Sequence, residues 1–189
     1  MKVPLLWLSA AMVVSAVAAE APEISDATLR AYPSLHKMTA QARPVAMGFS
    51  PLCRPDPQVT AARKASGPHA GNWINVYMNE TARNHFESKT AGGYPPGSIV
   101  VKEKLSTVSP DMTAAKASAV AGLIKHAPGY NAATGDWEFF YSATGGKMER
   151  GTQARLASCA DCHQNASADY VFGDFAKPAP NAPAQPVAR

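Results

Sequence analysis

Five residues near the C-terminus, Cys159-Ala160-Asp161-Cys162-His163, constrain the fold of this chain more than any other segment. Two thiols and an imidazole so close together must face one partner from a single turn of backbone. The Cys-x-x-Cys-His pattern is typical of c-type haem attachment, in which both thiols add to the porphyrin vinyl groups and the histidine binds the iron. We therefore expect one covalent haem, with thioethers at Cys159 and Cys162 and with His163 as the iron ligand.

Zinc binding, a disulfide and a redox dithiol are the alternative interpretations of the cysteine pair. A structural zinc site would need two further ligands with their own close spacing. The remaining cysteine and histidines show no second paired spacing; they are Cys53, His36, His69, His85 and His126. Haem attachment is therefore the favoured interpretation.

The N-terminus supports this interpretation independently. Met1 and Lys2 give a positive start, residues 3–17 are almost wholly apolar, and small residues follow at positions 17–19. This pattern predicts a signal peptide over residues 1–19, so that the mature chain begins at Glu20 and is periplasmic. The apolar run is short for a membrane span, and an uncleaved anchor is the alternative. After signal cleavage we expect no membrane span.

Composition limits the rest of the chain. With 46% hydrophobic and 17% charged residues, residues 20–175 fit one haem c domain with a buried core. The Pro/Ala-rich residues 176–189 predict a disordered tail. A net charge of +4 is too mild to indicate nucleic-acid binding. Three cysteines exclude a disulfide framework and leave Cys53 as a buried thiol or a site for an intermolecular bond.

Hydrophobic periodicity and capping residues predict the main elements. Helices are expected over residues 24–38, with Ser25 or Asp26 as N-cap, over 80–89 after the cap residue Asn79, and over about 153–164 around the Cys-x-x-Cys-His motif. Residues 41–70 are expected to form a loop with at most a short helix near 60–64. Strands are expected over 72–78, over 98–105, from about 118, and over 137–141.

The strand over 98–105 has two distinct faces, because side chains alternate across a strand. One face should carry Val100, Lys102 and Lys104. The opposite face should carry Ile99, Val101, Glu103 and Leu105. A lysine on a strand is usually a solvated surface charge, so Lys102 has no assigned role from this pattern alone.

The position of the motif separates two classes of haem protein. Small electron-carrier cytochromes have it near the N-terminus with a later Met ligand, but no Met or His follows His163 here. Helical-bundle cytochromes have it near the C-terminus, but the predicted strands contradict a bundle. We therefore predict an α+β fold, mainly an antiparallel sheet with flanking helices and a C-terminal haem-attachment helix, with one open coordination position on the iron.

Three segments together resemble the cytochrome P460 family. They are residues 97–104 with Val-Lys-Glu, residues 129–139 with Gly-Tyr-Asn and Gly-Asp-Trp-Glu-Phe, and residues 159–172 with the motif and Asp-Tyr-Val-Phe. The resemblance spans roughly residues 72–175. It implies a homodimeric periplasmic haem protein of a family whose prototype oxidises hydroxylamine, and whose relatives, the beta-type cytochromes c′, bind nitric oxide. It also implies that Lys102 forms a third covalent bond to the porphyrin and acts as a catalytic residue through that bond.

The chain departs from the family pattern on the distal side. Ile74 stands where the prototype of the family has an arginine, and no distal acid is identified in the Ala-rich segment; Glu103 and Asp136 are candidates. His69 and His85 are the alternative distal ligands.

Two functions of different classes therefore remain. One is an oxidoreductase acting on hydroxylamine or another small nitrogen oxide and passing electrons to a soluble cytochrome. The other is a non-catalytic cytochrome that binds nitric oxide or carries electrons.

Overall fold

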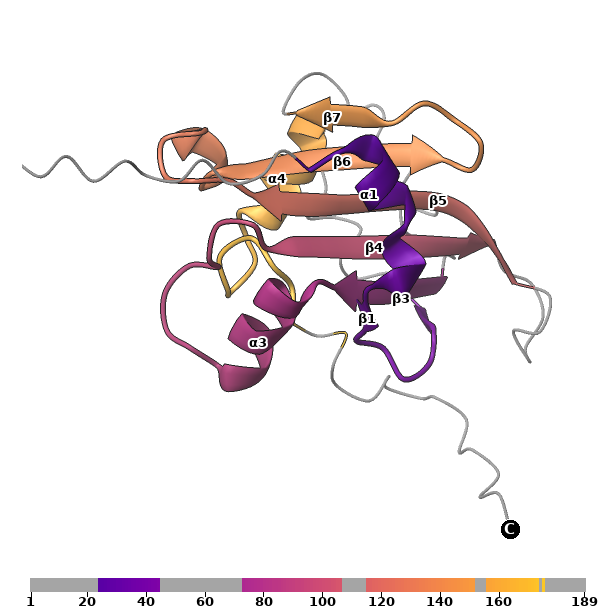
Figure 1. Ribbon diagram of the computed structural model, residues 1–189, viewed down its shortest axis with the longest axis horizontal. Helices are drawn as coiled ribbons and strands as arrows, with labels where there is room; N and C mark the ends of the chain where they lie inside the picture. The colour runs from indigo at the N-terminus through magenta and orange to yellow at the C-terminus, as the bar shows by residue number, and fades with distance from the viewer. Residues whose placement is uncertain (1–23, 45–72, 107–114, 152–155, 174, 176–189) are drawn as a thin grey trace, which may run out of the picture.

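The computed structural model describes residues 24–44, 73–106, 115–151, 156–173 and 175 (Figure 1). Within these residues seven strands form one antiparallel sheet with the order β1-β3-β4-β5-β6-β7, while β2 also pairs with β3. The strands are β1 His36–Lys37, β2 Arg43–Pro44, β3 Trp73–Met78, β4 Ile99–Ser106, β5 Lys116–Lys125, β6 Trp137–Ala143 and β7 Glu149–Gly151. Together with the helices, this sheet confirms the predicted α+β class.

The central strands match the sequence prediction closely. β3, β4 and β6 fall on the three expected segments, and the strand expected from about residue 118 is β5, which begins at Lys116. Gly122 of β5 explains part of the packing, since a Cβ there would lie 2.3 Å from the carbonyl oxygen of Val100 and 2.4 Å from the ring of Phe140. β7 was not predicted, because a strand of only three residues is too short to show the alternation of polar and apolar residues that marks a strand.

The predicted helix over residues 24–38 is wrong in its length. Helix α1 covers only Asp26–Arg30, capped by the Ser25 side chain, and a short 3-10 helix η1 follows at Tyr32–Ser34. Pro33 has no N–H for a helical hydrogen bond and restricts the residue before it, so the α-helix ends ahead of it. The chain then turns into β1, which pairs with β3.

Helix α3, Glu80–Ser88, confirms the predicted cap at Asn79. The Asn79 side chain accepts hydrogen bonds from the backbone N–H groups of Ala82 at 3.1 Å and Ile99 at 3.0 Å. It also donates to the carbonyl of Gly97 at 2.8 Å. One side chain therefore begins α3 and joins it to the start of β4.

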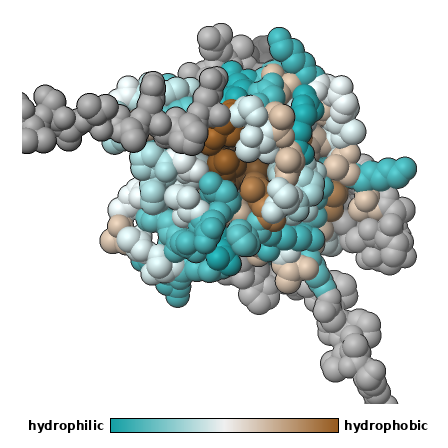
Figure 2. Space-filling view, in the orientation of Figure 1, coloured by the Kyte–Doolittle hydropathy of each residue, from teal (hydrophilic) through white to brown (hydrophobic). Residues whose placement is uncertain are grey.

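The sheet has a different core on each face. On the α4 face, named after the C-terminal helix α4 (Ala157–His163), α3 and α4 cover Val76, Val100 and Phe139. On the opposite α1 face, helix α1 covers Tyr77, Val101 and Phe140. Figure 1 shows α1 crossing the side of the sheet turned to the viewer, with α4 behind it. In the same orientation, Figure 2 shows apolar residues in the middle of the α1 face, bordered by hydrophilic ones.

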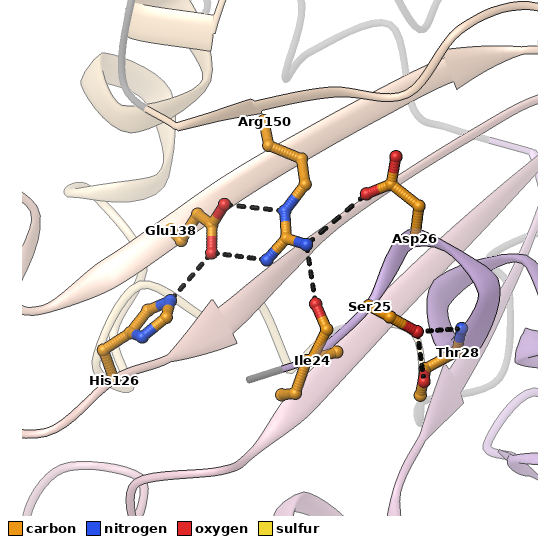
Figure 3. A network of polar contacts seen from close by, with 7 residues as sticks. All are labelled: Ile24, Ser25, Asp26, Thr28, His126, Glu138 and Arg150. Carbon is orange, nitrogen blue, oxygen red and sulfur yellow. Dashed lines mark hydrogen bonds and ion pairs between the residues drawn. The ribbon is translucent and has the colours of Figure 1, made fainter. Parts of the chain in front are cut away.

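A partly buried network of polar contacts joins the N-terminal segment to the end of the sheet on the α1 face (Figure 3). Arg150 of β7 donates to both carboxylate oxygens of Glu138 on β6 at 2.8 and 2.9 Å, and to the carbonyl of Ile24 at 2.6 Å. His126 lies 2.7 Å from Glu138, whose side chain is only 8% exposed. Burial raises the pKa of Glu138, but the hydrogen bonds and charges of Arg150 and His126 outweigh burial and hold the pKa below its usual value.

Several sequence predictions lie outside the described residues: the signal peptide 1–19, the tail 176–189, Cys53, His69 and the short helix near 60–64. Over the ranges that the structure does describe, none of the helices has the length and apolar character needed to cross a bilayer.

Asn79→Ala should lower the free energy of unfolding by about 2 kcal/mol, since a lost N-cap costs about 1 kcal/mol and the N–H of Ile99 also loses its acceptor. Chemical denaturation measures this change. Asn84→Ala is the matched control on the exposed side of α3 and should change the free energy by less than about 0.5 kcal/mol. Equal effects of the two variants would contradict the role given to Asn79.

Glu138→Gln should make thermal stability less dependent on pH in acid. Because the folded-state pKa of Glu138 is lowered, its stabilisation is present above the pKa of the unfolded carboxyl, about 4.3, and is lost as the pH falls through the folded value. Melting temperatures from pH 7 to 3 should show the wild type more stable at neutral pH and the two curves converging in acid. Parallel curves would contradict this assignment.

Candidate haem site

Helix α4 presents the Cys-x-x-Cys-His motif to the sheet. It begins at Ala157 rather than near residue 153, and residues 152–155 lie outside the described ranges. Cys162 is buried and Cys159 is half-buried. Cys159 packs against the core cluster that contains Phe139. Because residues three apart on a helix are neighbours on its surface, the two cysteine side chains lie on the same side of α4.

His163, the last residue of α4, lies between two aromatic rings. The ring of Phe139 from β6 is 5.6 Å away and that of Phe172 is 5.2 Å away, both edge to face. Nδ1 of His163 lies 2.6 Å from the carbonyl oxygen of Tyr170. A carbonyl only accepts hydrogen bonds, so Nδ1 carries the proton and Nε2 retains its lone pair for a metal.

Burial lowers the pKa of His163, and the positive charge of Lys102 lowers it further, whereas the hydrogen bond to Tyr170 acts in the opposite direction. The resulting pKa is about 4. The imidazole is therefore neutral at physiological pH, which is the form that binds iron.

Lys102 of β4 shares the α4 face with Val100, as the alternation predicted. Its register partners are Val76 on β3 and Ala121 on β5, so it lies in the middle of the sheet. Its charge acts on the imidazole of His163. Lys104, two residues along the same strand, lies over the ring of Tyr141 at 5.8 Å. Lys102 and His163 are 61 residues apart in the sequence, and the fold places both on the α4 side of the sheet.

The segment after α4, with the sequence Asp-Tyr-Val-Phe at residues 169–172, returns to the sheet. Val171 is buried in the α4-face core, and Phe172 contacts His163. Asp169 accepts hydrogen bonds from Nζ of Lys125 at 2.8 Å and from the backbone N–H of Tyr94 at 2.7 Å. Sequence reasoning missed this ion pair, because Lys125 at the end of an apolar strand gives no signal of its partner.

The two acids considered as distal groups are both engaged elsewhere. Glu103 points to the α1 face, where it accepts hydrogen bonds from Tyr32 at 2.7 Å and Asn75 at 2.8 Å. Asp136 accepts from the backbone N–H groups of the 129–131 turn at 3.1 and 2.9 Å. His85 packs against Tyr94, with ring centroids 4.4 Å apart.

The residues present fit a haem better than a bare metal ion. The described ranges contain no group of three or more His, Cys, Asp or Glu side chains that could hold a metal. A haem requires less of the protein: two thiols, one imidazole and an apolar wall. Trp137, fully buried in the same core, has an indole N–H without an acceptor among the described residues. A bound group with carboxylates, as haem has, would satisfy such a donor.

Comparison with known proteins agrees with this geometry. The family model for cytochrome P460 matches residues 56–173, which is more than half of the chain. The match includes β3 to β7, α4 and the returning segment. A search of curated proteins gave no match.

Proposed function

The chain belongs to the cytochrome P460 family of haem proteins, and on that premise we propose that it is a periplasmic c-type cytochrome with one haem, joined to Cys159 and Cys162. His163 supplies Nε2 to the iron, because its Nδ1 proton is held by the Tyr170 carbonyl. Export directed by a signal peptide at residues 1–19 is consistent with attachment of the haem outside the cytoplasm. The family resemblance also suggests a homodimer.

We propose that the protein is an oxidoreductase acting on hydroxylamine or another small nitrogen oxide, with a soluble cytochrome as electron acceptor. The position of Lys102 carries this proposal. It lies on the face of the sheet that α4 covers, and its positive charge lowers the pKa of His163, the residue that would bind the iron. A bound haem would supply an iron that accepts electrons from a nitrogen ligand and passes them on.

A covalent bond from Lys102 to the porphyrin would distort the macrocycle and change its electronic structure, which is one of the means by which a protein tunes haem reactivity. The buried core of the α4 face is apolar and includes Val76, Val100 and Leu123. Such a wall limits water near the bound ligand.

One observation favours a second function, the binding of nitric oxide or electron transfer without catalysis. Oxidation of hydroxylamine releases protons that need an acceptor near the iron. Glu103 faces away from α4, Asp136 holds a turn, and Asp169 is paired with Lys125. Ile74, at the position of the prototype arginine, brings no polar group either.

Mapping of the haem peptides tests the covalent bonds. In the wild type, mass spectrometry should find the porphyrin attached to Cys159, Cys162 and Lys102, and the Soret band of the ferrous protein should lie far to the red of ordinary haem c. Lys102→Met should keep both thioethers but lose the third bond and the red shift. Lys104→Met, on the same face of the same strand, is the matched control and should keep all three bonds. A wild-type porphyrin with no bond to Lys102 would contradict the cross-link.

Anaerobic assays with an artificial electron acceptor test the enzyme function. Wild-type protein should oxidise hydroxylamine faster than a free-haem control, and Lys102→Met should lose roughly tenfold or more of that rate, about 1.4 kcal/mol in the barrier. A wild-type rate no greater than that of free haem, together with tight binding of nitric oxide, would favour the second function.

A further inference from the structure

We propose that the ion pair between Lys125 and Asp169 positions the proximal histidine and thereby sets the reduction potential of the iron. It does so by fixing the backbone carbonyl of Tyr170, the hydrogen-bond acceptor of His163. This inference rests on the proposed function in one respect, that His163 is the iron ligand. Lys125 and Asp169 are positioning residues, because each acts through Tyr170.

The ion pair is short and well shielded. Nζ of Lys125 lies 2.8 Å from Oδ2 of Asp169, and the two side chains are only 12% and 16% exposed. The same ammonium donates to the carbonyl of Gly135 at 2.7 Å and lies 5.1 Å from the centre of the Trp137 ring. With Tyr94 also donating to Oδ2, Asp169 is held from two separate elements. Because it is shielded from water, this ion pair restricts the positions of both side chains far more than a surface ion pair would.

The backbone that this pair holds is strained. Asp169 has φ 41° and Tyr170 has φ 66°, both in the left-handed region that non-glycine residues rarely adopt. Such a conformation is unfavourable for a residue with a side chain and persists only where its surroundings hold it. Two consecutive residues of this kind direct the Tyr170 carbonyl toward Nδ1 of His163 at 2.6 Å. Without the side-chain contacts of Asp169, the backbone would relax and the carbonyl would turn away.

The ring of Tyr170 is fixed by the same loop that binds Lys125. A Cβ at Gly135 would lie only 2.7 Å from that ring, so the ring packs directly against the glycine backbone. The hydroxyl of Tyr170 also donates to the carbonyl of Ala133 at 3.3 Å. The 133–135 turn, Lys125 and Asp169 therefore form one continuous support on one side of the histidine.

The hydrogen bond from His163 to the Tyr170 carbonyl affects how strongly the imidazole would bind iron. A strong acceptor at Nδ1 increases the basicity of an imidazole ligand, which strengthens its bond to iron. A more basic ligand stabilises ferric over ferrous iron and lowers the reduction potential. A weakened hydrogen bond should therefore raise the potential and weaken the iron–histidine bond.

The test uses haem-loaded protein and three variants of the support. Asp169→Ala removes the ion pair, Asp169→Asn removes its charge but keeps an oxygen for the Tyr94 N–H, and Gly135→Ala displaces the Tyr170 ring without changing charge. Arg150→Met is the control, since it breaks a buried ion pair on the opposite face of the sheet. Resonance Raman spectra of the ferrous protein give the iron–histidine stretching frequency, and redox titration gives the potential.

We expect a lower stretching frequency and a higher potential in all three variants of the support, with the smallest change in Asp169→Asn. Arg150→Met should lower the melting temperature but leave both values as in the wild type. If Asp169→Ala does not bind haem, Asp169→Asn and Gly135→Ala decide the question. If the stretching frequency and the potential are unchanged in the variants of the support, or change equally in the control, this inference is overturned while the proposed function stands. A wild-type protein without an iron–histidine band would overturn the proposed function as well.

Discussion

The alternation of side chains across the antiparallel sheet divides this protein into two environments. From Ile99 to Lys104 of β4, and along β6, successive residues lie on opposite faces, so neighbouring residues in the sequence have unrelated roles. Lys102 faces α4 and its charge acts on His163, whereas Glu103 binds Tyr32 and Asn75 on the far side. Phe139 contacts the histidine, whereas Phe140 packs under α1. A shift of one residue in register would exchange these two sets completely.

On each face of the sheet, a different ion pair fixes the segment that covers it. On the α1 face, Arg150 joins Glu138 to the carbonyl of Ile24 and so fixes the N-terminal segment. On the α4 face, Lys125 and Asp169 fix the segment that follows α4. The two ion pairs are similar in burial but differ in what depends on them. Only the second stands beside the hydrogen bond from His163 to Tyr170.

The sequence was most informative where the determinants are local. The two faces of β4 were predicted from the alternation of side chains along a strand. The role of Asn79 was predicted from the residue types that begin helices, and the haem-attachment motif was recognised from the spacing of its residues. The prediction was wrong where a helix-breaking residue interrupts a helical hydrophobic pattern. Pro33 does this in the helix expected over residues 24–38. The support of His163 had no local signal, because Lys125, Gly135 and Asp169 meet only in the folded chain. Their contacts depend on the path of the backbone, including two left-handed residues that no composition rule suggests.

We propose above all that α4 holds a haem against the α4 face through Cys159, Cys162 and His163. An experimental structure of the purified protein, with anomalous diffraction measured at the iron edge, tests this claim most directly. We predict one iron per chain bonded to Nε2 of His163, with continuous density from both cysteine sulfurs to a porphyrin. An iron bound elsewhere, or a His163 whose Nε2 bears no metal in the loaded protein, would contradict the account.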